Sequence, residues 1–415
     1  MAARPAGATR GQNAPLAMLS VLGVLLLVGP ALYAAVWGWL RGGSSFSRAT
    51  NGTAPPRPLS KKEGALGGAV HAKRAPLFSI MLAARDEAAT LPHLLHALGQ
   101  QALPPHLFEV LIADDHSTDG TAALVAAAAQ TTPFALKLIK LPAGVTGKKA
   151  ALAAAEAQAR APWAVCTDAD CRPGPGWLRA YADLLAAAEV AAAPLHFISG
   201  PVRLTPGGAW FDALLGLEFA GLVGVGAGCI GRGQPTMCNG ANLAFRRRTF
   251  REVGGYADNQ QLASGDDEFL LHHIHQRYPA GVRFLADARA LVDTPAPATW
   301  RALLRQRVRW ASKYPHYRTP APRRLAVLVL GTNVSLALGL VLALLWSALW
   351  PWVGAAWALK LGADAWLLAP VLRLLARRRW LLALLPLQLL YAPYALAVGL
   401  AGQRGSYRWK GRQVR

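Results

Sequence analysis

The feature that most constrains this chain is a stretch of 25 residues without a charged side chain, from Leu16 to Leu40. A helix rises about 1.5 Å per residue, so a helix of this length crosses a hydrocarbon core of about 30 Å. A cleavable signal peptide would have an apolar region of only about 7–15 residues before a small-residue cleavage site. This stretch instead ends in bulky residues, among them Trp37 and Trp39. The sequence therefore predicts a retained transmembrane anchor over residues 1–41.

A second apolar block occupies residues 325–403 and divides into three candidate segments, Leu325–Leu349, Trp352–Leu375 and Trp380–Leu400. The second segment contains Lys360 and Asp364, whose i,i+4 spacing allows them to pair within a helix. It could instead lie at the membrane interface. The third segment contains Pro386 and Pro393, so it could be a kinked span or a re-entrant segment.

Positive charge is concentrated at the two ends of the chain. Residues 1–75 have a formal net charge of +8, residues 76–293 of −3 and residues 294–415 of +17, which together give +22. Because basic residues beside membrane segments stay in the cytoplasm, the middle domain is predicted to face the cytosol, in an integral protein of a bacterial cytoplasmic membrane. The slightly acidic middle argues against a nucleic-acid partner.

These observations divide the chain into five parts. The anchor is followed by a juxtamembrane linker over residues 42–75, a catalytic domain over residues 76–315, a C-terminal transmembrane region over residues 316–403 with two or three segments, and a basic tail over residues 404–415. The side of the membrane on which the tail lies is left open, because three complete crossings would export it and a re-entrant third segment would retain it. The four cysteines are too few for a disulfide framework and have no metal-ligand spacing, so we expect reduced thiols.

The middle domain alternates short apolar runs with helical stretches, which is typical of a βαβ sheet. The expected strands are Leu77–Ala84, Phe108–Ala113, Phe134–Leu141 and Trp163–Thr167, and the expected helices span about 87–101, 122–129 and 148–161. This pattern predicts a doubly wound α/β nucleotide-binding fold, in which ligands bind at the carboxyl ends of the strands.

Two carboxylates, Asp114 and Asp115, follow the second predicted strand. Acidic acceptors at this edge of the sheet suit the N–H and hydroxyl groups of a nucleoside. The following Ser117, Thr118 and Asp119 could simply cap the next helix, but that explanation does not account for Asp114 and Asp115.

Asp168 and Asp170 follow the buried strand Trp163–Thr167. Their alternation places both carboxylates on one side, where they could hold a hard divalent cation that bridges two phosphates. An Asp-x-Asp triplet alone is weak evidence, because it is often a solvated turn, but its place after a buried strand strengthens it.

Lys148 lies at the expected start of a helix and could contact a phosphate there, although a solvated lysine is the ordinary explanation. Gly147-Lys148-Lys149 is not a Walker motif, because Pro142 stands in the place of its first glycine.

Three consecutive acids, Asp266, Asp267 and Glu268, precede an apolar helix start. Acids are favoured in a first helical turn by the macrodipole, but three exceed what a cap needs, so one could be a general base. We interpret His272, His273 and His275 as a polar helix face, because they lack the i,i+4 spacing of a helical zinc site.

Gln306, Arg309 and Trp310 lie at i, i+3 and i+4, on one helical face, so they could act together on a ligand. The alternative is a basic amphipathic stretch at the membrane interface, with Trp310 at the level of the headgroups.

These elements in this order resemble the inverting family 2 glycosyltransferases, whose catalytic domain has the GT-A nucleotide-diphospho-sugar transferase fold. The segments that carry the resemblance are Ala84–Glu87, Asp114–Thr121, Gly147–Leu152, Asp168–Asp170, Asn239–Phe245 with Gly254–Tyr256, Asp266–Asp267 and the Gln-x-x-Arg-Trp motif Gln306–Trp310. Asp266 replaces a common Glu of the family and His116 a common Gly. The tail segment Arg408–Arg412 is similar to the cytosolic ends of several membrane-bound members.

The resemblance implies roles for individual residues. Asp115 would contact the uracil or other base, and Asp86 or Glu87 would line the nucleotide pocket. Asp114, Lys148 and Asp168 complete the residues that would bind the nucleotide sugar. Asp170, with Asp168 beside it, would ligate Mg²⁺ or Mn²⁺; Asp267, with Asp266, would supply the base; and Gln306, Arg309 and Trp310 would hold the acceptor or the diphosphate. The implied donor is a nucleotide-diphospho-sugar, most simply a UDP-sugar, and the expected acceptor is a lipid or a glycan at the membrane. The alternatives are a processive polysaccharide synthase and, from another class, a non-catalytic membrane scaffold or transporter subunit.

Overall fold

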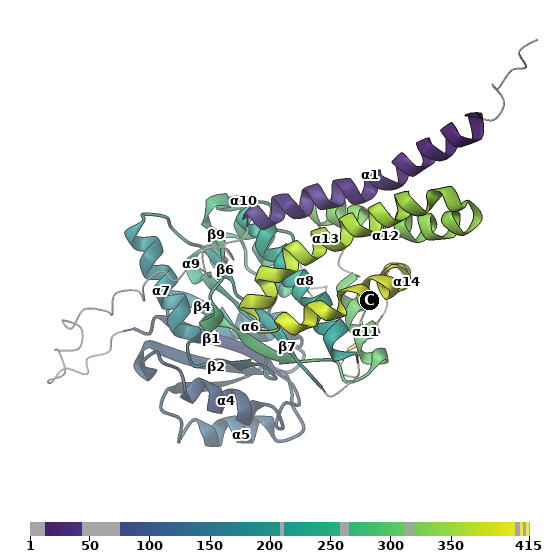
Figure 1. The fold of residues 1–415 in the computed structure, drawn as a ribbon. Helices are drawn as coiled ribbons and strands as arrows, with labels where there is room; N and C mark the ends of the chain where they lie inside the picture. Colours follow the sequence, from purple (N-terminus) through teal and green to yellow (C-terminus); the bar gives the residue numbers. More distant parts are fainter. Residues whose placement is uncertain are drawn as a thin grey trace, which may run out of the picture.

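The computed structural model describes residues 13–43, 75–207, 211–257, 265–311, 317, 319–402, 407–409 and 412–414. An α/β domain carries a group of long helices at one side, where α1 (Asn13–Gly43), α12 (Ala321–Leu345) and α13 (Trp350–Leu374) pack side by side (Figure 1). The predicted linker falls mostly outside the described residues, as do several residues of the basic tail.

Within the described ranges, seven strands form the main sheet in the order β3-β2-β1-β4-β8-β6-β9. They are β1 (Phe78–Ala84), β2 (Phe108–Asp114), β3 (Ala135–Lys140), β4 (Trp163–Cys166), β6 (Phe197–Ser199), β8 (Leu243–Arg246) and β9 (Val282–Phe284). Only β8 among these strands runs antiparallel to its neighbours. The mixed α/β fold and the first four strands predicted from the sequence are confirmed, with ends that differ by one or two residues.

Helices cover both faces of this sheet, because successive side chains of a strand point to opposite faces. In β1, Ile80 and Leu82 belong to one apolar core and Met81 to the other. The helices of the domain are α4 (Leu91–Gly99), α5 (Thr121–Ala128), α6 (Lys148–Gln158), α7 (Trp177–Val190), α9 (Arg247–Glu252), α10 (Asp266–Arg277) and α11 (Trp300–Ala311). The first begins later than predicted, because residues 87–90 form a turn in which Thr90 Oγ1 donates to Glu87 Oε2 at 2.6 Å.

Shorter elements complete the described structure. A small sheet has the order β5-β10-β7, with β5 (Arg172–Pro173), β7 (Val202–Thr205) and β10 (Val292–Pro295), and a hairpin joins β11 (Tyr407–Trp409) to β12 (Arg412–Val414). The 3-10 turns are η1 (Pro105–Leu107), η3 (Pro279–Gly281), η4 (Ala288–Ala290), η6 (Ser347–Leu349) and η7 (Arg378–Ala383). All four cysteines lie in described parts of the chain and are free thiols, as expected.

Helix α8 (Asp212–Gly231) was not recognised from the sequence as an apolar helix. Four helices in the described residues are long and apolar enough to span a membrane, Met18–Gly43, Asp212–Gly231, Ala321–Leu345 and Ser347–Leu374. The most apolar window of α8 is 67% buried, against 22% for those of α1 and α12, because α8 packs against α1, α13 and β7. A helix that is apolar all round and enclosed by protein joins the α/β domain to the long helices.

The third predicted C-terminal segment differs from the first two. Its start forms the 3-10 turn η7, and α14 (Leu384–Gly402) follows, with Pro393 inside the helix. Helix α14 packs against α11 and α12, and it is not one of the four candidate spans found in the described residues.

Candidate active site

The carboxyl ends of β1, β2 and β4 open onto a cavity of about 1010 Å³ that extends from the α/β domain to the long helices. Ten of the twelve residues to which the resemblance assigns roles line it: Glu87, Asp115, Lys148, Asp168, Asp170, Asp266, Asp267, Gln306, Arg309 and Trp310. Segments as far apart as β1 and α11 therefore contribute to one site.

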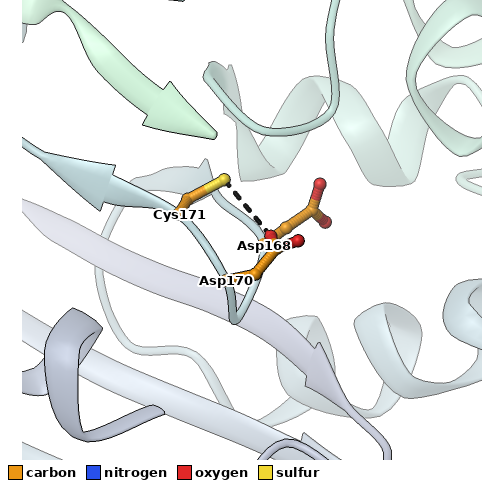
Figure 2. A group of neighbouring side chains, drawn as sticks. All are labelled: Asp168, Asp170 and Cys171. Carbon is orange, nitrogen blue, oxygen red and sulfur yellow. Dashed lines mark hydrogen bonds between the residues drawn. The ribbon is translucent and has the colours of Figure 1, made fainter. Parts of the chain in front are cut away.

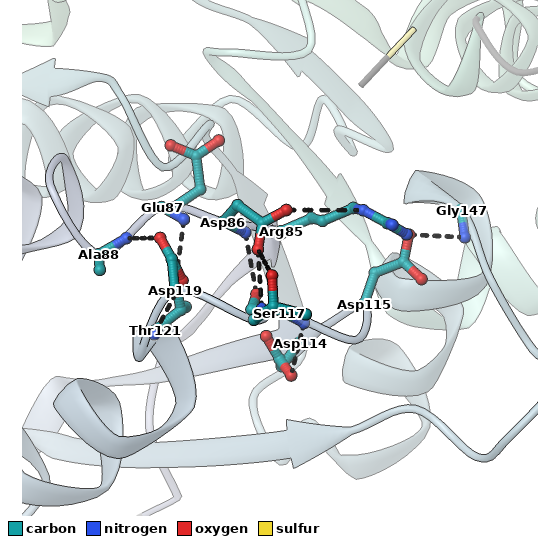
Figure 3. A network of polar contacts seen from close by, with 11 residues as sticks. Arg85, Asp86, Glu87, Ala88, Asp114, Asp115, Ser117, Asp119, Thr121 and Gly147 are labelled. Carbon is teal, nitrogen blue, oxygen red and sulfur yellow. Dashed lines mark hydrogen bonds and ion pairs between the residues drawn. The ribbon is translucent and has the colours of Figure 1, made fainter. Parts of the chain in front are cut away.

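Asp115 is held at the cavity wall by backbone and side-chain partners. Its side chain is buried, and its Oδ2 accepts a hydrogen bond from the Gly147 N–H at 3.0 Å. Arg85 Nη1 lies 3.7 Å from the same oxygen (Figure 3). Gly147 has a φ of +105°, a conformation that a residue with a Cβ rarely adopts, so a glycine is needed at this contact. Arg85 belongs to the motif Ala84–Glu87, but the sequence gives no sign of its contact with Asp115.

Asp86 and Asp114 do not line the cavity, unlike the other residues to which the resemblance assigns roles. Asp86 Oδ1 accepts from the Thr118 N–H at 2.8 Å, and Asp114 Oδ2 accepts from the Ser117 N–H at 3.4 Å, so both carboxylates hold the loop after β2 (Figure 3). Asp86 has a φ of +53° and His116 of +58°. The left-handed backbone at His116 explains why a glycine suits this position in the resembling family.

Two carboxylates and a thiol, those of Asp168, Asp170 and Cys171, lie together after β4, and we call them the acidic group (Figure 2). Their potential ligand atoms all lie within 4.8 Å of one another. Burial, followed by repulsion from Asp168 and Glu87, raises the pKa of Asp170. Burial raises the pKa of Cys171 well above its usual value, so this thiol stays protonated. The clustered carboxylates thus suit a hard divalent cation with oxygen ligands, and the thiol is not needed as a ligand.

Lys148 lies between two of the predicted functional carboxylates rather than in solvent. Its Nζ is 2.8 Å from Asp168 Oδ1 and 3.3 Å from Asp266 Oδ2. Burial disfavours the charged form, but attraction to Asp168 and Asp266 outweighs it and raises the pKa of Lys148 well above its usual value. The ammonium therefore links the acidic group after β4 to the first turn of α10.

Asp267 lies in the first turn of α10, and backbone donors fix its carboxylate. Its Oδ2 accepts from the Gly240 N–H at 2.9 Å, and its Oδ1 accepts from the Glu268 N–H at 2.8 Å. A Cβ on Gly240 would lie 3.3 Å from Lys148 Nζ and 3.5 Å from Asp267 Oδ2, so the close approach favours a glycine. This contact between distant segments could not be read from the sequence.

Some polar side chains of helix α11 pack inside the protein, and others line the cavity. Arg307 is buried and forms an ion pair with Glu218 of α8, with Nε and Oε1 3.1 Å apart. Its guanidinium also lies 4.4 Å from the ring centroid of Trp310, and its Nη1 donates to Gln306 Oε1 at 2.7 Å. Arg307 thus orients two of the three residues predicted to bind the acceptor or diphosphate.

The histidines of α10 do not all lie on a polar face, as the sequence suggested. His272 is buried, and its ring contacts Tyr317 at a centroid distance of 5.5 Å. Burial lowers the pKa of His272 to about 4. The Tyr317 hydroxyl donates to Glu268, so one aromatic residue after α11 covers both the histidine and the first turn of α10. Packing against a distant segment overrides the local pattern here.

Residues 79–254 match the family model described as glycosyl transferase family 2. Among solved structures, the mannosyltransferase PcManGT from Pyrobaculum calidifontis in complex with GDP-Man and Mn²⁺ is similar, with a TM-score of 0.54 and 20% identity over 93% of this chain and 98% of that chain. S. aureus TarS 1-349 in complex with UDP-GlcNAc matches with a TM-score of 0.39 and 14% identity, over 81% of this chain and 96% of that chain. The comparison with curated protein sequences found no significant match.

The likeness to the mannosyltransferase establishes the fold, and the family match establishes the class of activity. Both agree with the mixed sheet and with the carboxylates gathered at its carboxyl edge. Residues 79–254 therefore belong to a family 2 glycosyltransferase domain with the GT-A fold, and the chain is a glycosyltransferase.

Proposed function

We propose that this glycosyltransferase is integral to a bacterial cytoplasmic membrane and moves a sugar, with inversion, from a nucleotide-diphospho-sugar to a membrane lipid. The observation that carries the proposal is the single cavity that joins the carboxylates of the α/β domain to apolar side chains of α12 and α14. Arg323 and Arg324, with the cluster Arg377–Arg379, support a domain that faces the cytosol.

Asp115 and Glu87 line the part of the cavity where a nucleoside would bind, and a UDP-sugar is the simplest donor. Asp168 and Asp170 would hold Mg²⁺ or Mn²⁺, which when bound neutralises the charge of the departing diphosphate. The mannosyltransferase of similar fold carries GDP-Man and Mn²⁺, which supports a nucleotide sugar and a divalent cation without choosing the base or the metal.

Asp267 is the proposed general base. Its carboxylate would take the proton of an acceptor hydroxyl as that oxygen attacks the anomeric carbon from the side opposite the diphosphate. The new bond to the acceptor oxygen forms while the bond from the anomeric carbon to the diphosphate oxygen breaks, so the configuration inverts. Its hydrogen bonds from the Gly240 and Glu268 N–H groups would hold the carboxylate in place for this step. Gln306, Arg309 and Trp310, which line the same cavity, would hold the acceptor or the diphosphate.

The test is transfer from a panel of labelled nucleotide sugars in purified membranes that contain the wild type, Asp267→Asn or Asp170→Ala. We expect metal-dependent transfer in the wild type and a loss of about 10²–10⁴-fold in Asp267→Asn, the range typical of general base catalysis. Asp170→Ala should need far more metal. Unchanged metal-dependent transfer in both variants would contradict the site assignment, and no reaction with any donor would contradict the proposed activity.

A further inference from the structure

Four polar side chains from α1, α13 and α14 meet inside the protein. Asp364 Oδ2 lies 2.6 Å from Lys360 Nζ, and the Asp364 carboxylate also accepts from the Tyr33 hydroxyl at 2.6 Å and from Gln388 Nε2 at 2.6 Å. Lys360 donates in turn to Gln388 Oε1. The pairing of Lys360 with Asp364 expected from their spacing is thus confirmed, and residues from α1 and α14 complete what we call the polar cluster.

Burying the charged side chains of the polar cluster costs free energy, which helix packing alone does not explain. Lys360 is 2% exposed and Asp364 is 5% exposed, and both belong to a candidate membrane span. A charged residue at the centre of a membrane helix is costly to insert and is usually retained for a function. Replacing a buried ion pair by apolar residues is often neutral or stabilising. Buried charges in such a segment therefore point to a ligand.

All four residues of the polar cluster line the cavity that also contains Asp267 and Asp168. The same lining includes Val327 and Leu330 of α12, which are 71% and 38% exposed. The cavity wall thus continues onto the outer surface of an apolar helix. The apolar wall that α12 and α14 contribute to the cavity suits the chains of a lipid.

The charge balance of the polar cluster favours an uncharged head. The whole cavity lining contains nine acidic side chains and six Lys or Arg side chains, and a divalent cation on Asp168 and Asp170 would offset part of this negative charge. Near the long helices, Asp364 neutralises Lys360 and Glu218 neutralises Arg307. The polar cluster itself therefore offers no unpaired cation to a lipid phosphate. A phosphate oxygen is also already ionised and needs no general base, whereas a hydroxyl does.

We propose that the polar cluster is an acceptor-binding site for the hydroxyl-bearing, uncharged head of a membrane lipid, which enters the cavity past α12 and α14. Two of the three N–H donors of Lys360 are used by Asp364 and Gln388, so a third can be donated to an ester carbonyl oxygen of the lipid head. The free hydroxyl of the lipid then keeps its proton for the general base Asp267. The proposal rests on the proposed function and names its acceptor class.

The test uses the full chain in phosphatidylcholine vesicles that contain diacylglycerol, polyprenyl phosphate or no added lipid, with the donor identified by the nucleotide-sugar panel. The variants are Gln388→Leu and the double variant Lys360→Met with Asp364→Leu, which leaves no unpaired buried charge. Ser335→Ala is the matched control, because Ser335 Oγ donates within α12 to Thr332 O at 2.8 Å and does not line the cavity. Binding of UDP with Mn²⁺ and the melting temperature report on folding.

We expect the wild type to transfer sugar to diacylglycerol and not to polyprenyl phosphate. Both cluster variants should raise the KM for diacylglycerol about tenfold, as the loss of one or two hydrogen bonds does, while their affinity for UDP with Mn²⁺ stays that of the control. A cluster that only clamps the helices would lower the melting temperature without changing this KM.

Two results would overturn the inference while leaving the proposed activity standing. One is an unchanged KM in a folded double variant. The other is a wild type that hydrolyses the donor but transfers sugar only to polyprenyl phosphate, or to neither lipid. A wild type that neither hydrolyses nor transfers any donor sugar would instead contradict the proposed function itself.

Discussion

The ammonium of Lys148 lies 2.8 Å from Oδ1 of Asp168, the first carboxylate of the Asp-x-Asp triplet. A divalent cation on Asp168 and Asp170 would approach the same oxygen. The lysine therefore acts as a tethered counter-ion for a carboxylate that we assign to the metal. Because it also lies 3.3 Å from Asp266, it connects the metal carboxylates with the first turn of α10.

We predict that Lys148→Met binds Mn²⁺ about tenfold more tightly than the wild type when no donor is present. Removing a positive charge beside Asp168 strengthens its attraction for a cation, and charges 4 Å apart interact by about 4 kcal/mol at an effective dielectric constant of 20. Titration of free Mn²⁺ by electron paramagnetic resonance measures the affinity. The exposed Lys137→Met is the control. Weaker binding in Lys148→Met would show that the lysine is not a competitor of the metal.

Asn242 should be required for folding rather than for acceptor binding. It is fully buried: its Nδ2 donates to Pro201 O at 2.7 Å and Ala290 O at 2.8 Å, while its Oδ1 accepts from Trp177 and Tyr181. Asn242→Leu leaves these groups unsatisfied, at about 1–3 kcal/mol each, so we expect a loss of several kcal/mol.

The measurement for Asn242→Leu is the melting temperature of the purified protein, with the exposed Thr131→Ala as a control that should change little. A variant that melts like the wild type but loses transfer would contradict the structural role and favour direct contact with the acceptor.

The ion pair of Arg307 with Glu218 should stabilise the junction between α11 and α8. Both side chains are under 10% exposed, at 5% and 9%. Glu218→Leu leaves a buried guanidinium unpaired, which costs about 3–5 kcal/mol. Adding Arg307→Met should recover much of this loss, and melting curves of both single variants and the double variant measure the coupling. Additive losses would mean that the pair contributes no coupling energy.

Acid should destabilise the domain through His272. Burial lowers its pKa in the fold to about 4 from 6.5, so the unfolded chain binds more protons between these values. The stability that His272 contributes is complete above pH 6.5 and is lost as the pH falls toward 4. A shift of this size corresponds to roughly 3 kcal/mol.

The check on His272 is the melting temperature as a function of pH, compared between the wild type and His272→Gln. The variant has no imidazole to protonate, so its melting temperature should fall less between pH 6.5 and 4. Parallel curves for the two proteins would assign the acid sensitivity to other groups.

Local patterns determined much of this protein. The uncharged run in α1 is a property of consecutive residues, and so are the alternation that builds β1 and the carboxylates that follow β2 and β4, because each depends on neighbours within a few positions. The order of these motifs was enough to indicate the GT-A fold and the class of activity, which the family match establishes.

Only the tertiary structure decided which of these residues face the cavity. Asp86 and Asp115 look alike in the sequence, yet only Asp115 lines the cavity. The Asp86 carboxylate instead accepts a hydrogen bond from the Thr118 N–H in the loop after β2. The contact of Lys148 with Asp266 and the joining of Tyr33 and Gln388 to the Lys360–Asp364 pair also depend on the packing of segments far apart in the chain. Charge and hydropathy act locally along a sequence, whereas the shape of a cavity is set by contacts between distant segments, and those contacts exist only in the folded chain.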